Sequence, residues 1–150
     1  MADMEQKKRI LLAKSQIDAH DRGVRYIARK LVEAGAEVIF IRYGLPDEIV
    51  YAALQEDVDV IGLSFSTGTP LTVVPKVMDL LRAQGVTDKV VIVGGIVPDD
   101  IVPELKEAGV TGVFGPGSDP ADIIETIERS ISMIPSAEVI SSNKKLRRKE

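Results

Sequence analysis

The sequence contains no cysteine and only one histidine, His20. A chain without cysteine forms no disulfide, zinc-thiolate or iron–sulfur site of its own, and it fits a reducing compartment. The sequence also lacks any apolar run near the roughly 20 residues that span a bilayer. Residues 1–8 are polar and charged, unlike a signal peptide. We therefore expect a cytoplasmic protein without a membrane segment.

The sequence has no excess of basic residues either. Its 19 Lys and Arg are outnumbered by 23 Asp and Glu, which gives a net charge of −4. Phosphate recognition requires a basic surface, so we do not expect nucleic acid as a partner. The hydrophobic fraction of 45% and the length of 150 residues are typical of one soluble domain.

Short runs rich in Val and Ile alternate with segments of helical periodicity along the chain. The runs predict buried strands at 9–13, 37–42, 58–64, 89–93 and 112–114. The intervening patterns predict helices at 22–34, 46–56, 73–84, 101–108 and 120–133. Such β/α alternation predicts an α/β fold: a single flavodoxin-like (Rossmann-like), doubly wound, five-stranded parallel sheet of order 2-1-3-4-5.

The composition changes near the end of the chain. Residues 136–150 are rich in serine and then in lysine and arginine. We expect them to form a disordered basic tail that follows a single domain at residues 1–135.

Ligands of doubly wound sheets bind beyond the carboxyl ends of the strands, where the strand order reverses. The first predicted strand leads to Lys14, Asp18 and His20, and the third leads to Ser64 and Ser66. A histidine close to a carboxylate is typical of a metal ligand whose second ring nitrogen is held by that carboxylate. The glycines that follow strands four and five leave space for a bulky group against the backbone; they are Gly94, Gly95, Gly115 and Gly117.

Common ligands of this fold do not match this edge. The Gly-x-Gly-x-x-Gly motif of nicotinamide sites and the P-loop motif are both absent. A phosphoacceptor receiver domain requires an aspartate where this chain has Ser64, and a flavin mononucleotide site favours an uncharged first loop. The residues instead predict a site for a large ligand that includes a metal.

From about Lys8 to Arg129 the chain resembles the cobalamin-binding domain of the acyl-CoA mutases, the family of methylmalonyl-CoA mutase. The family motif Asp-x-His-x-x-Gly matches Asp18, His20 and Gly23, within the longer match His20-Asp21-Arg22-Gly23. Segment 55–64 resembles the third unit of the family, and the paired glycines match Gly94-Gly95. Two departures are Ala19 for the usual glycine and Ser66 for the usual leucine.

The resemblance implies a role for each matching residue. His20 would replace the benzimidazole of the cofactor as the lower axial ligand of cobalt. Asp18 would accept a hydrogen bond from the other imidazole nitrogen, and Lys14 would pair with Asp18. The displaced nucleotide tail would enter a slot beside Ser64 and the glycine-rich turns. The residues expected to contact the cofactor are Asp18, His20, Asp21, Arg22, Gly23, Ser64, Ser66, Gly94, Gly95, Gly115, Gly117 and Ser118.

The resemblance further implies adenosylcobalamin as cofactor and radical isomerisation of an acyl-CoA as the reaction. This chain lacks the barrel that binds the acyl-CoA substrate, so we expect a small subunit that is inactive without a large one. A corrinoid carrier for methyl transfer remains an alternative, although such carriers place a helical bundle before this domain. A cobalamin sensor or delivery protein that is not an enzyme is the other alternative.

Overall fold

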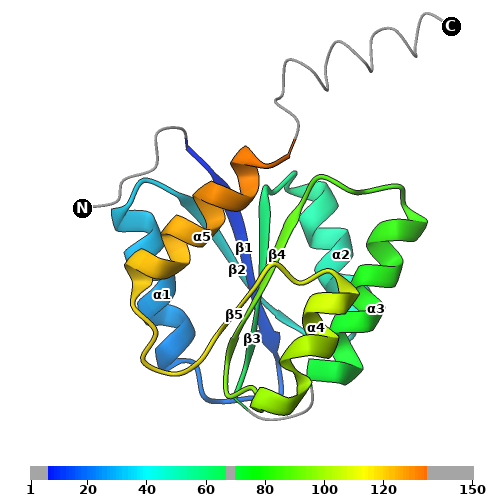
Figure 1. Ribbon diagram of the computed structural model, residues 1–150, viewed down its shortest axis with the longest axis horizontal. Helices are drawn as coiled ribbons and strands as arrows, with labels where there is room; N and C mark the ends of the chain where they lie inside the picture. The colour runs from blue at the N-terminus through cyan, green and yellow to red at the C-terminus, as the bar shows by residue number, and fades with distance from the viewer. Residues whose placement is uncertain (1–6, 67–69, 135–150) are drawn as a thin grey trace, which may run out of the picture.

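The computed structural model describes residues 7–66 and 70–134, which form a parallel five-stranded sheet with helices on both faces (Figure 1). The strands are β1 (Arg9–Ser15), β2 (Glu37–Tyr43), β3 (Val60–Phe65), β4 (Val90–Gly95) and β5 (Gly112–Phe114). The helices are α1 (Arg22–Glu33), α2 (Pro46–Gln55), α3 (Pro70–Ala83), α4 (Val102–Ala108), preceded by the 3-10 turn η1 (Asp99–Ile101), and α5 (Pro120–Ser132).

The strand order is β2-β1-β3-β4-β5, which confirms the predicted flavodoxin-like topology. Helices α1 and α5 cover one face of the sheet, and α2, α3 and α4 cover the other (Figure 1). The order reverses between β1 and β3, so the loops after these strands border the crevice where ligands of this fold bind. Within the described residues, no helix combines the length and the apolar character that a membrane span requires.

Each face of the sheet has its own hydrophobic core. Ile49, Val74 and Leu105 of α2, α3 and α4 pack on one face with Leu11 and Leu63. On the other face, the α1 and α5 side chains pack against alternate strand residues; these are Val24, Leu31, Ile123, Ile124 and Ile127 with Ile10, Leu12, Val60 and Ile92. Burial on both faces explains why the strands are nearly continuous apolar runs.

The predicted elements are present, and their boundaries differ at functionally important positions. β1 and β4 extend beyond their apolar runs to Ser15 and Gly95, because backbone pairing with neighbouring strands continues past the last apolar residue. Helix α3 begins at Pro70, before the predicted start at residue 73, and includes Pro75 in its interior. The predicted tail at 136–150 lies outside the described residues.

The register of the strands places two rows of residues on the α1 and α5 face, near the carboxyl edge of the sheet. One row joins Leu12, Gly62 and Ile92 across β1, β3 and β4. The next row, closer to the edge, joins Lys14, Ser64, Gly94 and Phe114. Glycine occupies the centre of both rows, so the sheet is bare of side chains there.

Candidate functional site

The predicted partnership of His20 and Asp18 is present in the loop between β1 and α1. Ring Nδ1 of His20 lies 3.0 Å from Asp18 Oδ1, and the backbone N–H of His20 donates to the same oxygen at 2.9 Å. The His20 side chain is 74% exposed, whereas that of Asp18 is 2% exposed. With the proton on Nδ1, ring Nε2 has a free lone pair that points away from the carboxylate. The loop thus presents one oriented nitrogen ligand.

Asp18 is a buried carboxylate surrounded by hydrogen-bond donors. Burial by itself would raise the pKa of Asp18, but the hydrogen bonds from the backbone and ring of His20, from Ser66 N–H and from Lys14 lower that pKa far below its usual range. The Ser66 N–H donates to Asp18 Oδ2 at 3.1 Å. Asp18 is therefore ionised at any physiological pH, and a carboxylate is a stronger acceptor for the imidazole N–H than a neutral group.

Lys14 lies fully buried beneath this loop. Its Nζ donates to the carbonyl oxygens of Asp18 at 2.5 Å and His20 at 2.7 Å, and lies 3.4 Å from Asp18 Oδ1. The expected pairing of Lys14 with Asp18 is confirmed, and it is a buried pair that also fixes the backbone on both sides of Ala19. The ammonium therefore shapes the loop that presents His20.

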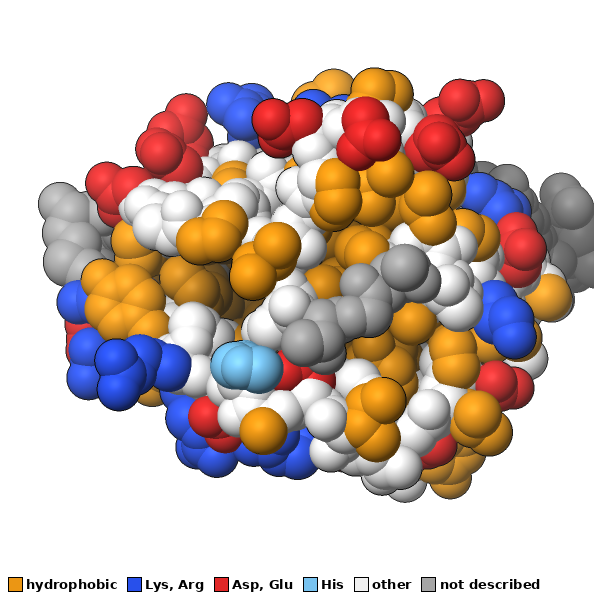
Figure 2. All heavy atoms as spheres, turned by 90° about the horizontal axis from the view of Figure 1, so that it is seen from below, with side chains coloured by type: hydrophobic (Ala, Val, Ile, Leu, Met, Phe, Trp, Pro, Cys, Tyr) orange, Lys and Arg blue, Asp and Glu red, His pale blue; other side chains and the backbone are white. Residues whose placement is uncertain are grey.

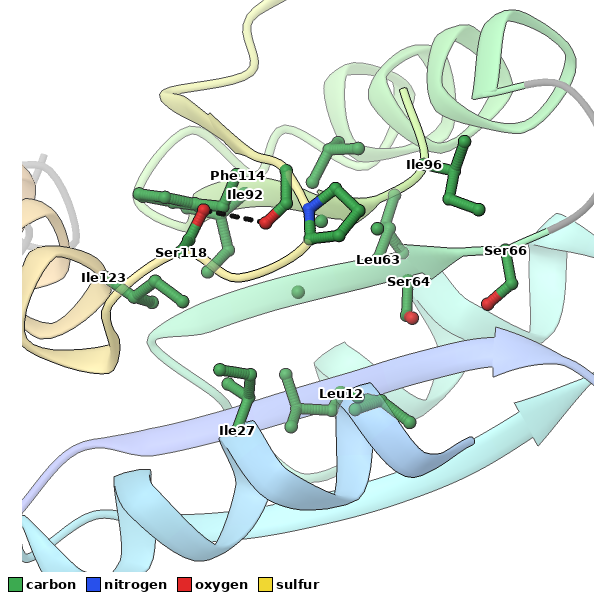
Figure 3. A pocket seen from close by; sticks show the side chains of 18 of the residues that line it. Leu12, Ile27, Leu63, Ser64, Ser66, Ile92, Ile96, Phe114, Ser118 and Ile123 are labelled. Atoms are coloured by element: carbon green, nitrogen blue, oxygen red, sulfur yellow. Dashed lines mark hydrogen bonds between the residues drawn. The ribbon is translucent and has the colours of Figure 1, made fainter. Parts of the chain in front are cut away.

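A pocket of about 320 Å³ opens beside His20. Figure 2 looks onto the carboxyl edge of the sheet, where the histidine lies at the surface next to a hollow and hydrophobic side chains. The close view in Figure 3 shows the pocket between helix α1 and the loops after β4 and β5. Its apolar wall comes from both the sheet and the helices: Leu12, Val24, Ile27, Ile92, Phe114 and Ile123.

The floor of the pocket depends on the two central glycines. A Cβ on Gly62 would lie 2.6 Å from Leu12 Cδ2, which is closer than side chains tolerate. A Cβ on Gly94 would meet only the Phe114 carbonyl oxygen, at 3.7 Å, and would otherwise occupy the pocket. The depth of the pocket therefore follows from the absence of side chains at these positions.

The structure brings most of the predicted site residues together around this pocket. Those that line it are His20, Gly23, Ser64, Ser66, Gly94, Gly95, Gly115, Gly117 and Ser118. Asp21 and Arg22 are not among the lining residues. Asp21 pairs instead with Arg25 at 2.8 Å and Arg42 at 2.6 Å, and these partners hold the pKa of Asp21 below its usual range. Contact of Asp21 and Arg22 with a cofactor stays a prediction.

Sequence reasoning missed the walls of the pocket. Leu12, Ile27, Ile92 and Phe114 look like ordinary core residues in the sequence, and only the three-dimensional arrangement shows that they border a cavity. Gly62 carried a usable signal, because glycine within a strand often marks the close approach of another group. Tyr26, which also lines the pocket, had no such signal.

One protein family and several individual proteins are similar in sequence to this chain. Residues 8–125 match the family described as B12 binding domain. The 2-hydroxyisobutanoyl-CoA mutase small subunit of Aquincola tertiaricarbonis is 42% identical over 125 residues, which are 83% of this chain and 92% of that protein. The pivalyl-CoA mutase small subunit of Xanthobacter autotrophicus is 45% identical over 120 residues, 79% of this chain and 80% of that protein. The methylmalonyl-CoA mutase of Escherichia coli is 33% identical over 88% of this chain, which corresponds to 19% of its own length.

Solved structures agree with the fold. A cobalamin-binding protein from Desulfitobacterium hafniense superposes with a TM-score of 0.67 and 26% identity, over 83% of this chain and 60% of that protein. The receiver domain of NarL from Mycobacterium tuberculosis has a TM-score of 0.66 at 15% identity, over 85% of this chain and 98% of that domain, a likeness of fold alone. Together with the His20 loop and the glycine-floored pocket, the matches identify this chain as a member of the B12-binding domain family, among the small subunits of acyl-CoA mutases.

Proposed function

We propose that this chain binds adenosylcobalamin and serves as the small subunit of an acyl-CoA mutase. In this proposal His20 Nε2 would bind the cobalt, in place of the benzimidazole of the cofactor. The displaced nucleotide tail occupies the pocket beside His20. The proposal keeps the cytoplasmic location expected from the cysteine-free sequence.

The observation that supports the proposal most strongly is the contrast between His20 and Asp18. The imidazole is 74% exposed, yet its Nδ1 is held by a carboxylate that is buried and ionised. A surface histidine without a ligand gains little from such a partner, whereas a metal-bound histidine gains orientation and basicity. Within the described residues, no group of three or more His, Asp or Glu side chains is placed so that it could hold a metal ion. The donor on offer is therefore a single imidazole.

The pocket also suits the nucleotide tail of the cofactor. It adjoins His20, its walls are apolar, and its floor is lined by Gly62 and Gly94. Such a cavity suits a flat aromatic base that is held by contacts over its whole surface. Ser64, on the strand row next to Gly94, presents a hydroxyl group to the same space (Figure 3).

Bound adenosylcobalamin supplies homolytic cleavage of a carbon–cobalt bond, which initiates rearrangement of a carbon skeleton. The residues of this chain orient and tune that group. Asp18 keeps the proton of His20 on Nδ1, so that Nε2 remains available, and Lys14 fixes the loop that carries both residues. The apolar pocket excludes water from the tail.

The substrate site is proposed to lie on a separate large subunit with a barrel domain. The two most similar relatives described above are named small subunits, and this chain covers 92% and 80% of their lengths. We expect the acyl-CoA to bind to the large subunit, and we expect the isolated small chain to be inactive.

Spectroscopy of the loaded protein tests the cobalt ligand. The purified chain is mixed with cobalamin, and the cobalt is reduced to Co(II). We expect its electron paramagnetic resonance spectrum to show nitrogen hyperfine splitting that changes when histidine is labelled with ¹⁵N. His20 is the only histidine, so the label reports on one residue. The His20→Ala variant should lose the splitting. A spectrum that is insensitive to the label would contradict the proposal.

An activity assay tests the division between subunits. Methylmalonyl-CoA and related branched acyl-CoA thioesters are incubated with the chain loaded with adenosylcobalamin, with and without a large mutase subunit. We expect turnover only with both. Turnover by the chain alone would contradict the proposed division, and stable capture of a methyltransferase instead of a mutase subunit would favour the methyl-carrier alternative.

A further inference from the structure

The two open edges of the sheet differ greatly in length. β5, at one edge, has three residues, and a very short edge strand is one way in which proteins avoid pairing with other chains. β2, at the other edge, has seven residues and pairs with β1 along its whole length. Residues 37–43 contain no proline, and their register with β1 has no bulge. The β2 edge is therefore a long, regular strand without these protective features.

Alternate backbone groups of β2 point away from the sheet. Glu37 N–H donates to the Lys8 carbonyl oxygen at 2.8 Å, and the Tyr43 carbonyl oxygen accepts from Gln16 N–H at 2.9 Å. The odd-numbered residues of β2 thus bond to the β1 side, and because the direction alternates along a strand, the even-numbered residues face outward. The outward-facing residues are Val38, Phe40 and Arg42. Their backbone N–H and C=O groups have no hydrogen-bond partner in the described part of the chain.

The side chains along this edge are apolar and partly exposed. Val38 and Phe40 pack against the core beneath α1, and Ile39 and Ile41 pack against the core beneath α2, yet all of them keep some contact with solvent. Helices α1 and α2 cover opposite faces of the sheet (Figure 1). The partial exposure of the β2 side chains shows that neither helix covers the edge itself.

The two charged side chains of β2 are already paired within the chain. Glu37 forms an ion pair with Arg9 of β1. Arg42 pairs with Asp21 at 2.6 Å, and its guanidinium lies 5.3 Å from the centroid of the Phe40 ring. Free charges on an edge strand discourage pairing with another strand. Charges that are neutralised in this way discourage it much less.

We propose that two copies of this chain associate through β2, with the two strands antiparallel about a twofold axis at Phe40. In this register Phe40 lies opposite Phe40 of the second copy, and Val38 lies opposite Arg42. Opposed residues whose backbone groups face each other exchange two hydrogen bonds. Every outward N–H and C=O group of these residues then gains a partner, and the two sheets become one.

A second copy suits this edge because the strand is complementary to itself. Rotation about Phe40 pairs the whole of β2, with Glu37 opposite Tyr43 and Ile39 opposite Ile41. No like charges meet, and the acidic beginning of one strand lies beside the basic end of the other. The two Phe40 rings come together on one face of the sheet, where aromatic cross-strand pairs are favourable. The interface uses the same residues of both copies, as twofold dimers do.

This arrangement leaves both candidate cofactor sites accessible. The strands of the two copies run in opposite directions, so the two carboxyl edges, each with its His20 loop, lie at opposite ends of the joined sheet. A large subunit can then bind at each end without displacing the β2 pair. The association is independent of the proposed function, and it is measured without cobalamin.

Sedimentation velocity of the full chain over a wide range of concentrations tests the dimer. We expect the wild type to show a monomer–dimer equilibrium. Val38→Lys places a cation opposite Arg42 of the second copy, whereas Val38→Glu places an anion opposite the same arginine. Each pair occurs twice in the dimer, so we expect Val38→Lys to dimerise about tenfold more weakly than Val38→Glu. The two variants are matched controls, because both replace one partly exposed valine by a charged side chain, and their urea midpoints show that both fold.

Hydrogen exchange of individual backbone amides provides a second measurement, on the unmodified chain. We expect exchange at Val38, Phe40 and Arg42 to slow as the protein concentration rises, because these N–H groups become hydrogen bonded in the dimer. The amides of β5, at the other edge of the sheet, should exchange at the same rate throughout.

Three results would overturn the proposal. The first is a chain that remains monomeric at every concentration. The second is a dimer in which Val38→Lys and Val38→Glu associate equally well, because the β2 pair in this register requires them to differ. The third is protection of the Val38, Phe40 and Arg42 amides only after a large mutase subunit is added, which would assign the edge to that partner. Loss of the His20 signal from cobalt would overturn the proposed function alone.

Discussion

Asp18 Oδ1 accepts hydrogen bonds from both the backbone N–H and the ring Nδ1 of His20, at 2.9 and 3.0 Å. One carboxylate oxygen thus fixes the position of the residue and the tautomer of its side chain. Asp18→Asn keeps the size of the side chain but removes the charge, and an amide accepts the imidazole proton more weakly. We expect the variant to bind cobalamin about 10–100 times more weakly, which is typical for loss of such a partner.

The tautomer provides a second measurement for Asp18→Asn. Protein labelled with ¹⁵N-histidine gives signals from one residue, whose two ring nitrogens differ in chemical shift according to which is protonated. We expect the Nδ1–H form to dominate in the wild type and to decline in the variant. Asp47→Asn, at an exposed carboxylate of α2, is the control. An unchanged tautomer ratio in Asp18→Asn would show that the carboxylate does not set it.

Lys14 and Lys89 are both largely buried. Lys14 lies near the carboxyl end of β1, and Lys89 directly precedes β4, so the two lysines allow a matched comparison of the two ends of the sheet. Lys14→Met leaves the ionised Asp18 without its ammonium in a buried site, and we expect the free energy of unfolding to fall by about 3–5 kcal/mol. Lys89 Nζ bonds the Val58 carbonyl oxygen, and its carboxylate neighbour Asp57 is 97% exposed. Lys89→Met should therefore destabilise less.

Urea unfolding measures both changes, and cobalamin titration distinguishes their positions. We expect Lys14→Met to weaken cobalamin binding, because the loop that presents His20 loses its internal anchor. Lys89→Met should leave the affinity unchanged. Equal effects of both variants on cobalamin binding would mean that Lys14 acts through general stability alone.

The sequence predicts the pairing of Asp18 with His20 well and the cavity poorly, for a physical reason. The relation between Asp18 and His20 is local, because two residues separated by one position in a loop can share hydrogen bonds regardless of distant contacts. The pocket depends on the register of separate strands, which brings Leu12, Gly62 and Ile92 into one row. That register is a property of the assembled sheet and has no local signature.

The elements of the fold could also be predicted from the sequence better than their boundaries. Alternation of apolar runs and helical periods predicts each element and, with right-handed crossovers, the strand order. The boundaries are less accurate where tertiary contacts oppose local preference. Pro75 is disfavoured inside a helix, but the burial of Val74 and Val77 on either side of it keeps α3 continuous from Pro70. The energy of packing, which the sequence pattern does not give, decides such boundaries.

Tyr43, at the end of β2, should make the free energy of unfolding depend on pH. Burial, with a further contribution from the charge of Asp18, raises the pKa of Tyr43 above its usual value of about 10. The folded chain then retains a proton that the unfolded chain loses, so the stability contributed below about pH 10 declines as the pH rises above it.

Urea unfolding at pH 8 to 11 measures this dependence as the difference between the wild type and Tyr43→Phe. We expect the advantage of the wild type over the variant to shrink above about pH 10. Tyr51→Phe, at a tyrosine that is 69% exposed, should show a constant difference over the same range. A constant difference for Tyr43→Phe as well would contradict the prediction.

Gly94 and Gly95 are adjacent at the end of β4, yet we expect their alanine variants to fail in different ways. Gly95 has φ +105°, and a Cβ there would overlap the Phe65 carbonyl oxygen, so Gly95→Ala should destabilise the fold itself. Gly94 has only an ordinary contact, at 3.7 Å, so Gly94→Ala should fold normally and place a methyl group in the pocket. We therefore expect Gly94→Ala to keep its urea midpoint and to bind cobalamin more weakly. Cobinamide, which lacks the base, should bind unchanged, because the proposed function assigns the pocket to the nucleotide tail. A Gly94→Ala variant with full cobalamin affinity would mean that the tail lies elsewhere.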